Sequence, residues 1–217
     1  MQEPIEACLH GQRLCVAKLQ DRLVNFIYDV IDPHAVLYGG TAIWRCYSGN
    51  RFSEDIDIYL SRDIDFEKVD FGRHGLSVKW RDPDDKFRIK LSDGVCDVSL
   101  DSKVVDMYGS SIAKQYETVN GMYRVVYTFR PEELLVRKME AYAGRRYVRD
   151  MYDIFHLTNF VDRNDYYVRD SLGKFLDKIK SPSDPAILST LIYKGDSSLT
   201  YDRIVDYLKR WLDEVRR

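Results

Sequence analysis

Two aspartates, separated by one residue, lie in a segment with the pattern of a β-strand. The segment reads Asp55-Ile56-Asp57-Ile58-Tyr59-Leu60, and alternate residues of a strand point to the same face. Both carboxylates therefore face one way, while Ile56 and Ile58 face the core. Two like charges at this spacing repel each other unless a cation lies between them, and hard oxygen ligands of this kind suit Mg²⁺ or Mn²⁺. The pair predicts a site for a divalent metal ion.

A possible phosphate site precedes the aspartates in the chain. Gly39-Gly40-Thr41 follows a short predicted strand at 35–38 and opens a predicted helix. Glycine lets the backbone approach a ligand closely, and the start of a helix offers N–H groups to an anion, to which Thr41 adds a hydroxyl. A phosphate cradle that faces a metal-holding strand is the arrangement needed for phosphoryl or nucleotidyl transfer, where catalysis is mainly positioning and charge neutralisation.

Each of these two motifs has an ordinary structural explanation when it is taken alone. A Gly-Gly pair is more often only a turn, and Asp-x-Asp on a strand is often a solvated face. Their order along the chain, strand, glycines, short helix and then the aspartate strand, favours the functional interpretation. Three further polar residues stay open: Ser53 could donate to a phosphate or finish a turn, Arg51 flanks the same strand, and Arg45 could face phosphate or solvent.

The predicted elements change character near residues 129–131. The first part is mixed, with a helical pattern at 5–31 and strands at 35–38, 55–60, 76–80, 87–91, 95–100 and 123–128, and with turns at 82–85 and 93–94. The second part has helical patterns at 131–143, 148–160, 165–179 and 200–216. We therefore expect an α+β protein, in which a core at 1–129 is followed by a helical region at 130–217 packed on it.

Composition excludes some classes of protein. Lys and Arg total 33 against 35 Asp and Glu, which does not support indiscriminate nucleic-acid binding, so any such contact needs a local patch such as 145–149 or 209–217. The four cysteines, at 8, 15, 46 and 96, lack zinc-site spacing. Cys8 and Cys15 are expected as small core residues, and reduced thiols are expected, although a bridge stays open. No apolar run is long enough for a membrane span, and a cytoplasmic location is expected.

The motifs together resemble a known family. Gly39-Gly40-Thr41-Ala42 and Arg51-Phe52-Ser53-Glu54-Asp55-Ile56-Asp57 are similar to the signature of the AbiEii/AbiGii-type nucleotidyltransferase toxins, within the polymerase-β-like superfamily. Downstream, 133–138 and 149–153 resemble that family's lysine motif and its Arg-Asp-x-Tyr-Asp motif. The resemblance covers roughly 35–160. It implies a polymerase-β-like nucleotidyltransferase core, with a mixed sheet and flanking helices, that moves a nucleoside monophosphate from an NTP to an acceptor hydroxyl and releases pyrophosphate.

The resemblance also implies a third carboxylate on a neighbouring strand, which joins Asp55 and Asp57 in metal binding and catalysis. Asp97 is the candidate, because it stands among apolar residues where an unpartnered charge costs free energy. Asp101 is the alternative, since it shares the face of Asp97 if the strand continues that far.

Further site residues come from the downstream motifs. Lys138 would place a point charge on the triphosphate. Asp150 lies near the active site by resemblance, or else it caps the helix that follows. The expected nucleotide-binding residues are Gly39, Gly40, Thr41, Arg51, Ser53 and Lys138.

The resemblance further implies partners. They are an NTP, the 3′ end of tRNA as acceptor, and an antitoxin protein that pairs with the chain in a type IV-like toxin–antitoxin system. A protein or small-molecule acceptor stays open. So does a non-catalytic module that kept the fold and binds a nucleotide or a partner, although the complete set of carboxylates favours an enzyme.

Overall fold

The computed structural model describes residues 3–82, 88–195 and 198–214. Contacts divide the chain into two compact units. Unit 1 comprises Met1–Ser48 and Ser53–Phe129, and unit 2 comprises Gly49–Phe52 and Arg130–Arg217. The chain therefore passes between the units three times, because the short segment Gly49–Phe52 belongs with the second. That 1–129 and 130–217 form separate domains stays a prediction.

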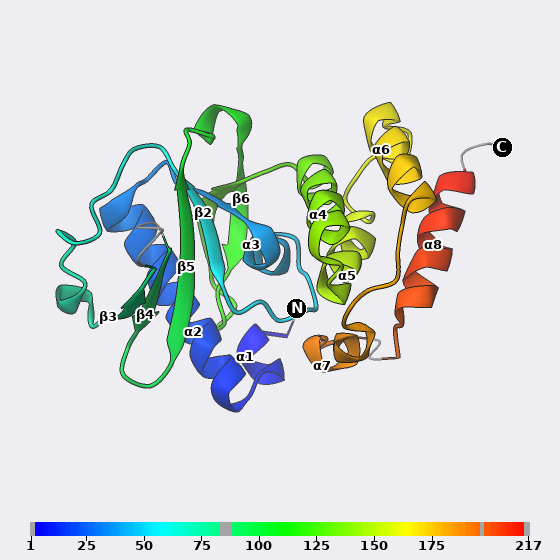
Figure 1. Ribbon diagram of the computed structural model, residues 1–217. Coiled ribbons are helices and arrows are strands. Elements are labelled where there is room, and N and C mark those ends of the chain that lie inside the picture. Colours follow the sequence, from blue (N-terminus) through cyan, green and yellow to red (C-terminus); the bar gives the residue numbers. More distant parts are fainter. Residues whose placement is uncertain (1–2, 83–87, 196–197, 215–217) are drawn as a thin grey trace. The chain divides into compact units, whose positions relative to one another are not determined.

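Unit 1 is built around a mixed sheet, which has seven strands in the described part of the chain, in the order β3-β4-β5-β2-β1-β7-β6 (Figure 1). Its strands are β1 Val36–Tyr38, β2 Ile56–Leu60, β3 Ser77–Arg81, β4 Arg88–Ser92, β5 Asp97–Val104, β6 Ile112–Glu117 and β7 Tyr123–Thr128. β2 is parallel to β5 and β1 to β7, while the other neighbours are antiparallel. The predicted α+β fold is confirmed.

The helices of unit 1 precede most of its strands. They are α1 Ile5–Cys8, α2 Gly11–Phe26, which continues as a π-helical turn at Ile27–Ile31, and α3 Gly39–Cys46. α2 contacts β5 and is joined to the β4–β5 hairpin by a disulfide between Cys15 and Cys96 and by an ion pair between Arg22 and Asp93, 3.1 Å apart. The expectation of reduced thiols is therefore wrong for Cys15 and Cys96, because the fold brings these distant residues together, and the bridge ties α2 to one face of the sheet.

The two faces of the sheet differ because side chains alternate along each strand. Val98 and Leu100 share the face of Cys96 and are buried, so α2 covers that face. Asp97, Ser99 and Asp101 point the other way. We call this second side of β2, β3, β4 and β5 the open face.

Unit 2 is helical in its described part. Its helices are α4 Pro131–Arg145, α5 Val148–Leu157, α6 Tyr166–Asp177, α7 Leu188–Leu191 and α8 Tyr201–Asp213. Pro131 occupies the first turn of α4, where its missing N–H costs nothing. Asp165 and Thr200 cap α6 and α8, each by accepting a hydrogen bond from a backbone N–H three residues on.

Several elements differ from the sequence prediction. The helical pattern at 5–31 is interrupted at Leu9–His10, and β5 runs to Val104 rather than ending at Leu100. Strand β6 and helix α7 were not predicted. Most of the turn predicted at 82–85, the predicted strand start at Phe87 and the end of the basic patch at 209–217 lie outside the described residues. Among the described helices, none has both the length and the apolar character that crossing a membrane requires.

Candidate active site

The aspartates of unit 1 converge because of how β2 pairs with β5. The two strands are parallel, and Asp57 lies directly opposite Asp101. Neighbouring strands lie about 4.8 Å apart, so these two carboxylates stand side by side on the open face. Ile56 and Ile58 point to the opposite face, which α2 covers and which we call the covered face. They are 0% and 1% exposed, as the alternation predicts.

The pairing of β5 with β4 orders the rest of this face in rows. Opposite Asp101 stands Arg88, opposite Ser99 stands Lys90, and opposite Asp97 stands Ser92. Four residues separate Asp97 from Asp101, which is about 13 Å along the strand. The register therefore places Asp101, the alternative, beside Asp57.

Asp97 is not remote from the candidate site. It lines a cavity of about 480 Å³ together with Glu54 and Asp55. That Asp97 is the third carboxylate stays a prediction, and the strand register favours Asp101 for that position.

The glycine turn meets the aspartate strand at Gly39. β1 and β2 are antiparallel, and Tyr38 lies opposite Asp57, so the start of α3 follows directly at the carboxylate. Gly39 has a φ of +72°, and a Cβ at this position would lie 2.0 Å from Oδ2 of Asp57. Only glycine fits there, for backbone conformation and for space alike. The structure thus brings together the glycine turn and the aspartate pair predicted from the sequence.

Polar side chains near the turn position the backbone. Thr41 is fully buried, and its hydroxyl donates a hydrogen bond to the carbonyl oxygen of Asp55. The carbonyl oxygen of Ser53 accepts one from Nε2 of Gln20 at 2.9 Å. The Thr41 hydroxyl is therefore engaged with the residues before β2 and positions the turn.

Arg45 on α3 faces neither phosphate nor solvent. It is 1% exposed and donates to the carbonyl oxygen of Ala17 at 3.1 Å and to Asp21 at 3.0 Å, both on α2. It anchors α3 to α2 inside unit 1.

The donor set suits a magnesium ion that arrives with phosphate. Among the described residues, no group of three or more His, Cys, Asp or Glu side chains is placed to hold a metal ion. Mg²⁺ usually takes only one or two protein carboxylates and completes its shell with water and substrate phosphate. Asp55 and Asp57, both half-buried, can supply these two, and the absence of a Cβ at Gly39 lets the Asp57 carboxylate lie directly against the glycine turn.

Unit 2 holds a separate buried ionic network around Asp153. Nε and one terminal nitrogen of Arg51 each contact an oxygen of Asp153 at 2.9 Å, and Nζ of Lys138 contacts Asp153 at 2.7 Å. Burial acts to raise the pKa of the Asp153 carboxyl, but Arg51 and Lys138 outweigh it and hold that pKa below its ordinary value. Arg51 therefore ties the segment Gly49–Phe52 into unit 2.

Asp150 extends this network. It is fully buried and accepts two hydrogen bonds from Arg145 at 2.8 Å each, while Nζ of Lys138 lies 3.2 Å away. Three cations, Arg51, Lys138 and Arg145, thus surround two carboxylates, Asp150 and Asp153. The side chain of Lys138 is 9% exposed. The roles of Lys138 and Arg51 in nucleotide binding, and of Lys138 and Asp150 in catalysis, stay predictions.

Comparison with protein families decides the class of the chain. The family model described as "Nucleotidyl transferase AbiEii toxin, Type IV TA system" matches residues 23–190. The chain belongs to this family. It is therefore a nucleotidyltransferase, as the sequence motifs predicted. A search of curated proteins gives no match.

Solved structures share the fold of this AbiEii-family chain. MenT4, nucleotidyltransferase toxin Rv2826c from Mycobacterium tuberculosis H37Rv, is 16% identical with a TM-score of 0.62, over 93% of this chain and 82% of that one. JHP933 from Helicobacter pylori is 18% identical with a TM-score of 0.59, over 96% and 95%. A putative nucleotidyltransferase from H. pylori is 18% identical with a TM-score of 0.60, over 96% and 98%.

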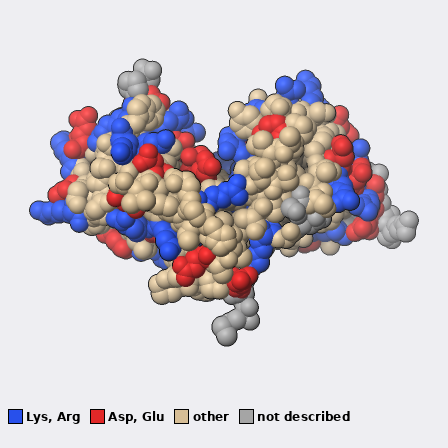
Figure 2. Space-filling model, turned by 90° about the horizontal axis from the view of Figure 1, so that it is seen from below, with Lys and Arg blue, Asp and Glu red and all other residues tan. Residues whose placement is uncertain are grey.

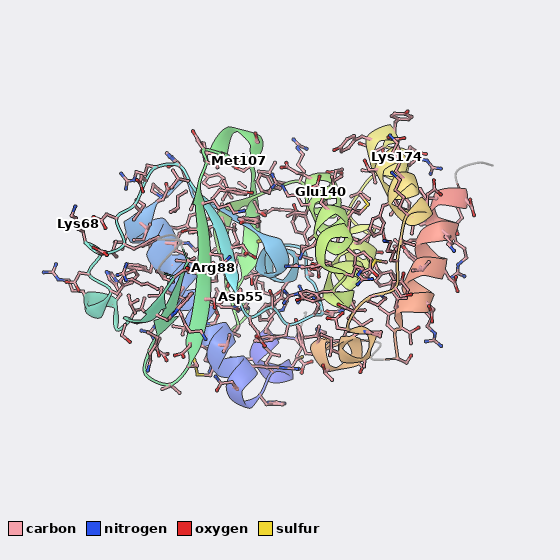
Figure 3. All side chains as sticks on the ribbon, viewed as in Figure 1. Asp55, Lys68, Arg88, Met107, Glu140 and Lys174 are labelled. Atoms are coloured by element: carbon pink, nitrogen blue, oxygen red, sulfur yellow. A yellow bond between two sulfur atoms is a disulfide. The ribbon has the colours of Figure 1, made fainter. Side chains whose placement is uncertain are left out.

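Sequence reasoning on this AbiEii-family chain missed the cations of the open face. Arg88 and Lys90 alternate with buried apolar residues on β4, in the same pattern that revealed Asp55 and Asp57. Nε of Arg88 lies 2.7 Å from Asp101. Figure 3 labels Arg88 near β4 and β5, and Asp55 near the start of β2. The alternation was visible in the sequence, but the register that aligns these residues with the aspartates was not.

Proposed function

We propose that this chain transfers a nucleoside monophosphate from an NTP to the 3′-terminal hydroxyl of a tRNA, as the toxin of a toxin–antitoxin pair. The observation that carries the proposal is the contact between Gly39 and Asp57, which sets a glycine turn against a carboxylate pair on a sheet face. Membership of the AbiEii family supports the reaction class and an antitoxin partner.

The glycine turn and three carboxylates of unit 1 have separate roles in this proposal. Backbone N–H groups at the start of α3 bind the triphosphate, beside Asp55 and Asp57. These two carboxylates would hold Mg²⁺, or Mn²⁺, which supplies charge neutralisation at the phosphates. Asp101 orients the acceptor hydroxyl and takes its proton. The hydroxyl oxygen forms a bond to the α-phosphorus, the bond to the bridging oxygen breaks, and pyrophosphate leaves.

The acceptor is proposed to be a nucleic acid contacted locally rather than through a dense basic face. Figure 2 shows Lys and Arg in several separate groups among Asp and Glu on the visible side, in keeping with the balance of 33 basic and 35 acidic residues. Such a surface suits binding at a confined site near the reacting groups.

Labelled NTPs test the proposal. Wild-type protein, Asp57→Asn and the exposed control Asp177→Asn are each incubated with Mg²⁺, one NTP at a time and total tRNA, and label in RNA is measured. We expect incorporation by the wild type and the control, and a loss of about a hundredfold or more in Asp57→Asn, because charge stabilisation at the phosphates is removed. Equal incorporation by all three proteins contradicts the assignment. Metal-dependent NTP binding without transfer to RNA, protein or small-molecule acceptors supports the non-catalytic module instead.

A further inference from the structure

An exposed tryptophan lies on the open face at the edge of the sheet. β3 pairs with β4 so that Val78 lies opposite Leu91, and after an irregularity at Lys79, Trp80 lies opposite Lys90. Leu91 is buried on the covered face, so Trp80 and Lys90 share the open face. Trp80 is 48% exposed.

Trp80 and Lys90 align with the aspartate pair across the sheet. Lys90 lies opposite Ser99 on β5, and Asp55 falls level with Ser99 when the β2–β5 register is extended by one residue beyond Ile56 and Leu100. Asp55, Lys79, Lys90 and Ser99 line the same cavity. The row from Asp55 to Trp80 crosses three strand spacings, about 14 Å, which a few nucleotides can span.

The exposed charges on this face differ between the centre of the sheet and its edge. The carboxylates of the candidate site stand on or next to β2 and β5, and Arg88 pairs both with Asp101 at 2.7 Å and with Asp82, which follows β3, at 3.5 Å. Farther out, Lys79 and Lys90 are exposed, and neither makes an ion pair within the described ranges. The lysines at the edge would therefore attract an anionic chain to this face. One end of that chain would lie near the carboxylates and the Mg²⁺ that they are proposed to hold.

We infer that the open face of β3, β4 and β5 binds single-stranded RNA, with one base stacked on Trp80 and backbone phosphates on Lys79 and Lys90. An exposed aromatic ring beside cations is the combination that binds unpaired bases, because every base has a face to stack. Paired bases are stacked inside a duplex and cannot reach the ring. The inference rests on the proposed function, since it supplies the path by which an RNA 3′ end reaches Asp101.

Tryptophan fluorescence tests the stacking directly. Trp44 and Trp211 are each 2% exposed, so quenching by an added oligonucleotide reports Trp80. A short single-stranded oligoribonucleotide of mixed sequence, added without NTP or metal, is expected to quench the wild type and Trp211→Phe but not Trp80→Phe. The same strand annealed to its complement is expected to quench weakly. Absence of quenching by the single strand, or equal quenching of Trp80→Phe, overturns the inference.

Affinity measurements test each contact. Trp80→Ala is expected to weaken binding of the single strand by about fivefold to a hundredfold, because base stacking is lost. Lys90→Gln and Lys79→Gln are each expected to reduce the slope of log affinity against log salt by about 0.7, which corresponds to one phosphate contact. Lys68→Gln is the control: its side chain is 85% exposed in a loop outside the sheet, and the slope should not change. Unchanged slopes in both lysine variants exclude the phosphate contacts.

The two proposals fail in different ways. If the wild type labels tRNA and Trp80→Ala labels it with the same KM for RNA, the nucleotidyltransferase assignment stands and the RNA path is wrong. If the single strand binds through Trp80 but no NTP is incorporated, the RNA site stands and the proposed reaction is wrong. Circular dichroism of each variant shows that a loss of binding is not a loss of fold.

Discussion

Gly39 is the residue at which the phosphate turn and the carboxylate strand constrain each other. In Gly39→Ala the new Cβ would meet Oδ2 of Asp57, and the residue would keep a positive φ. The left-handed conformation costs about 1–2 kcal/mol. Asp57 must also move, and displacement of a catalytic group by about 1 Å can lower the rate roughly a hundredfold. We expect nucleotide transfer to fall by about that factor, measured as initial rate, with a modest loss in Tm.

Gly11→Ala separates the two effects. Gly11 has a φ of +55°, but a Cβ there would meet nothing within 4 Å. The Gly11→Ala protein should therefore lose about as much stability as the Gly39→Ala protein, while it keeps the transfer rate of the wild type. If the two alanine variants lose activity equally, backbone strain rather than the Asp57 contact explains the effect.

Asp153 is expected to make unit 2 sensitive to acid. Its folded pKa lies below the ordinary value of 3.8 despite burial, because Arg51 and Lys138 hold the charged form. A depressed pKa gives stability that is fully present above the unfolded-state value and is lost as pH falls through the folded-state value.

Urea unfolding measures this effect through Trp211, a buried residue of α8. Wild-type stability should fall as the pH drops below about 4, and Asp153→Asn should be less stable by about 3–5 kcal/mol near neutral pH, because Arg51 and Lys138 lose a partner. Its acid dependence should be smaller than that of the wild type. An identical acid dependence in the two proteins would show that other groups are responsible.

At the scale of elements, the parallel register of β2 and β5 favours Asp101 over Asp97 as the third carboxylate. Asp101 is opposite Asp57, and Asp97 is four residues away. Asp101→Asn is therefore expected to lower the rate of nucleotide transfer by about a hundredfold or more, and Asp97→Asn by less than tenfold. The reverse order of the two rates would restore Asp97 as the third carboxylate.

Local pattern accounts for what the sequence predicted correctly. Alternation over 55–60 identified β2 and the face of Asp55 and Asp57, and Asp93-Gly94 identified the β4–β5 hairpin. Pro131 marked the start of α4. Each of these signals depends on residues that are neighbours in the chain.

The features that the sequence could not give depend on distant residues. The partner of Asp57 follows from a register between strands separated by more than thirty residues of chain. The ion pair of Arg51 with Asp153 joins residues 102 positions apart, so a residue next to the aspartate strand belongs to unit 2. β6 lacks a clear apolar alternation, since Lys114 and Gln115 lie in its middle, and its pairing with β7 defines it.

At the scale of the whole molecule, unit 1 alone carries the glycine turn and the aspartate pair, so bound nucleotide should stabilise that unit. Trp44 on α3 is a buried reporter of it, and a Trp80→Phe, Trp211→Phe protein isolates its fluorescence. A ligand at a hundred times its Kd stabilises the folded state by about 2.7 kcal/mol. When Mg²⁺ and NTP are added together, we expect the free energy of unfolding in urea, followed by Trp44 fluorescence, to rise by that amount. Mg²⁺ alone should raise it little, because two carboxylates leave most of the ion's shell to water and phosphate. Asp57→Asn should abolish the shift. A full shift with Mg²⁺ alone would instead require further protein ligands and a metal site formed before the nucleotide binds.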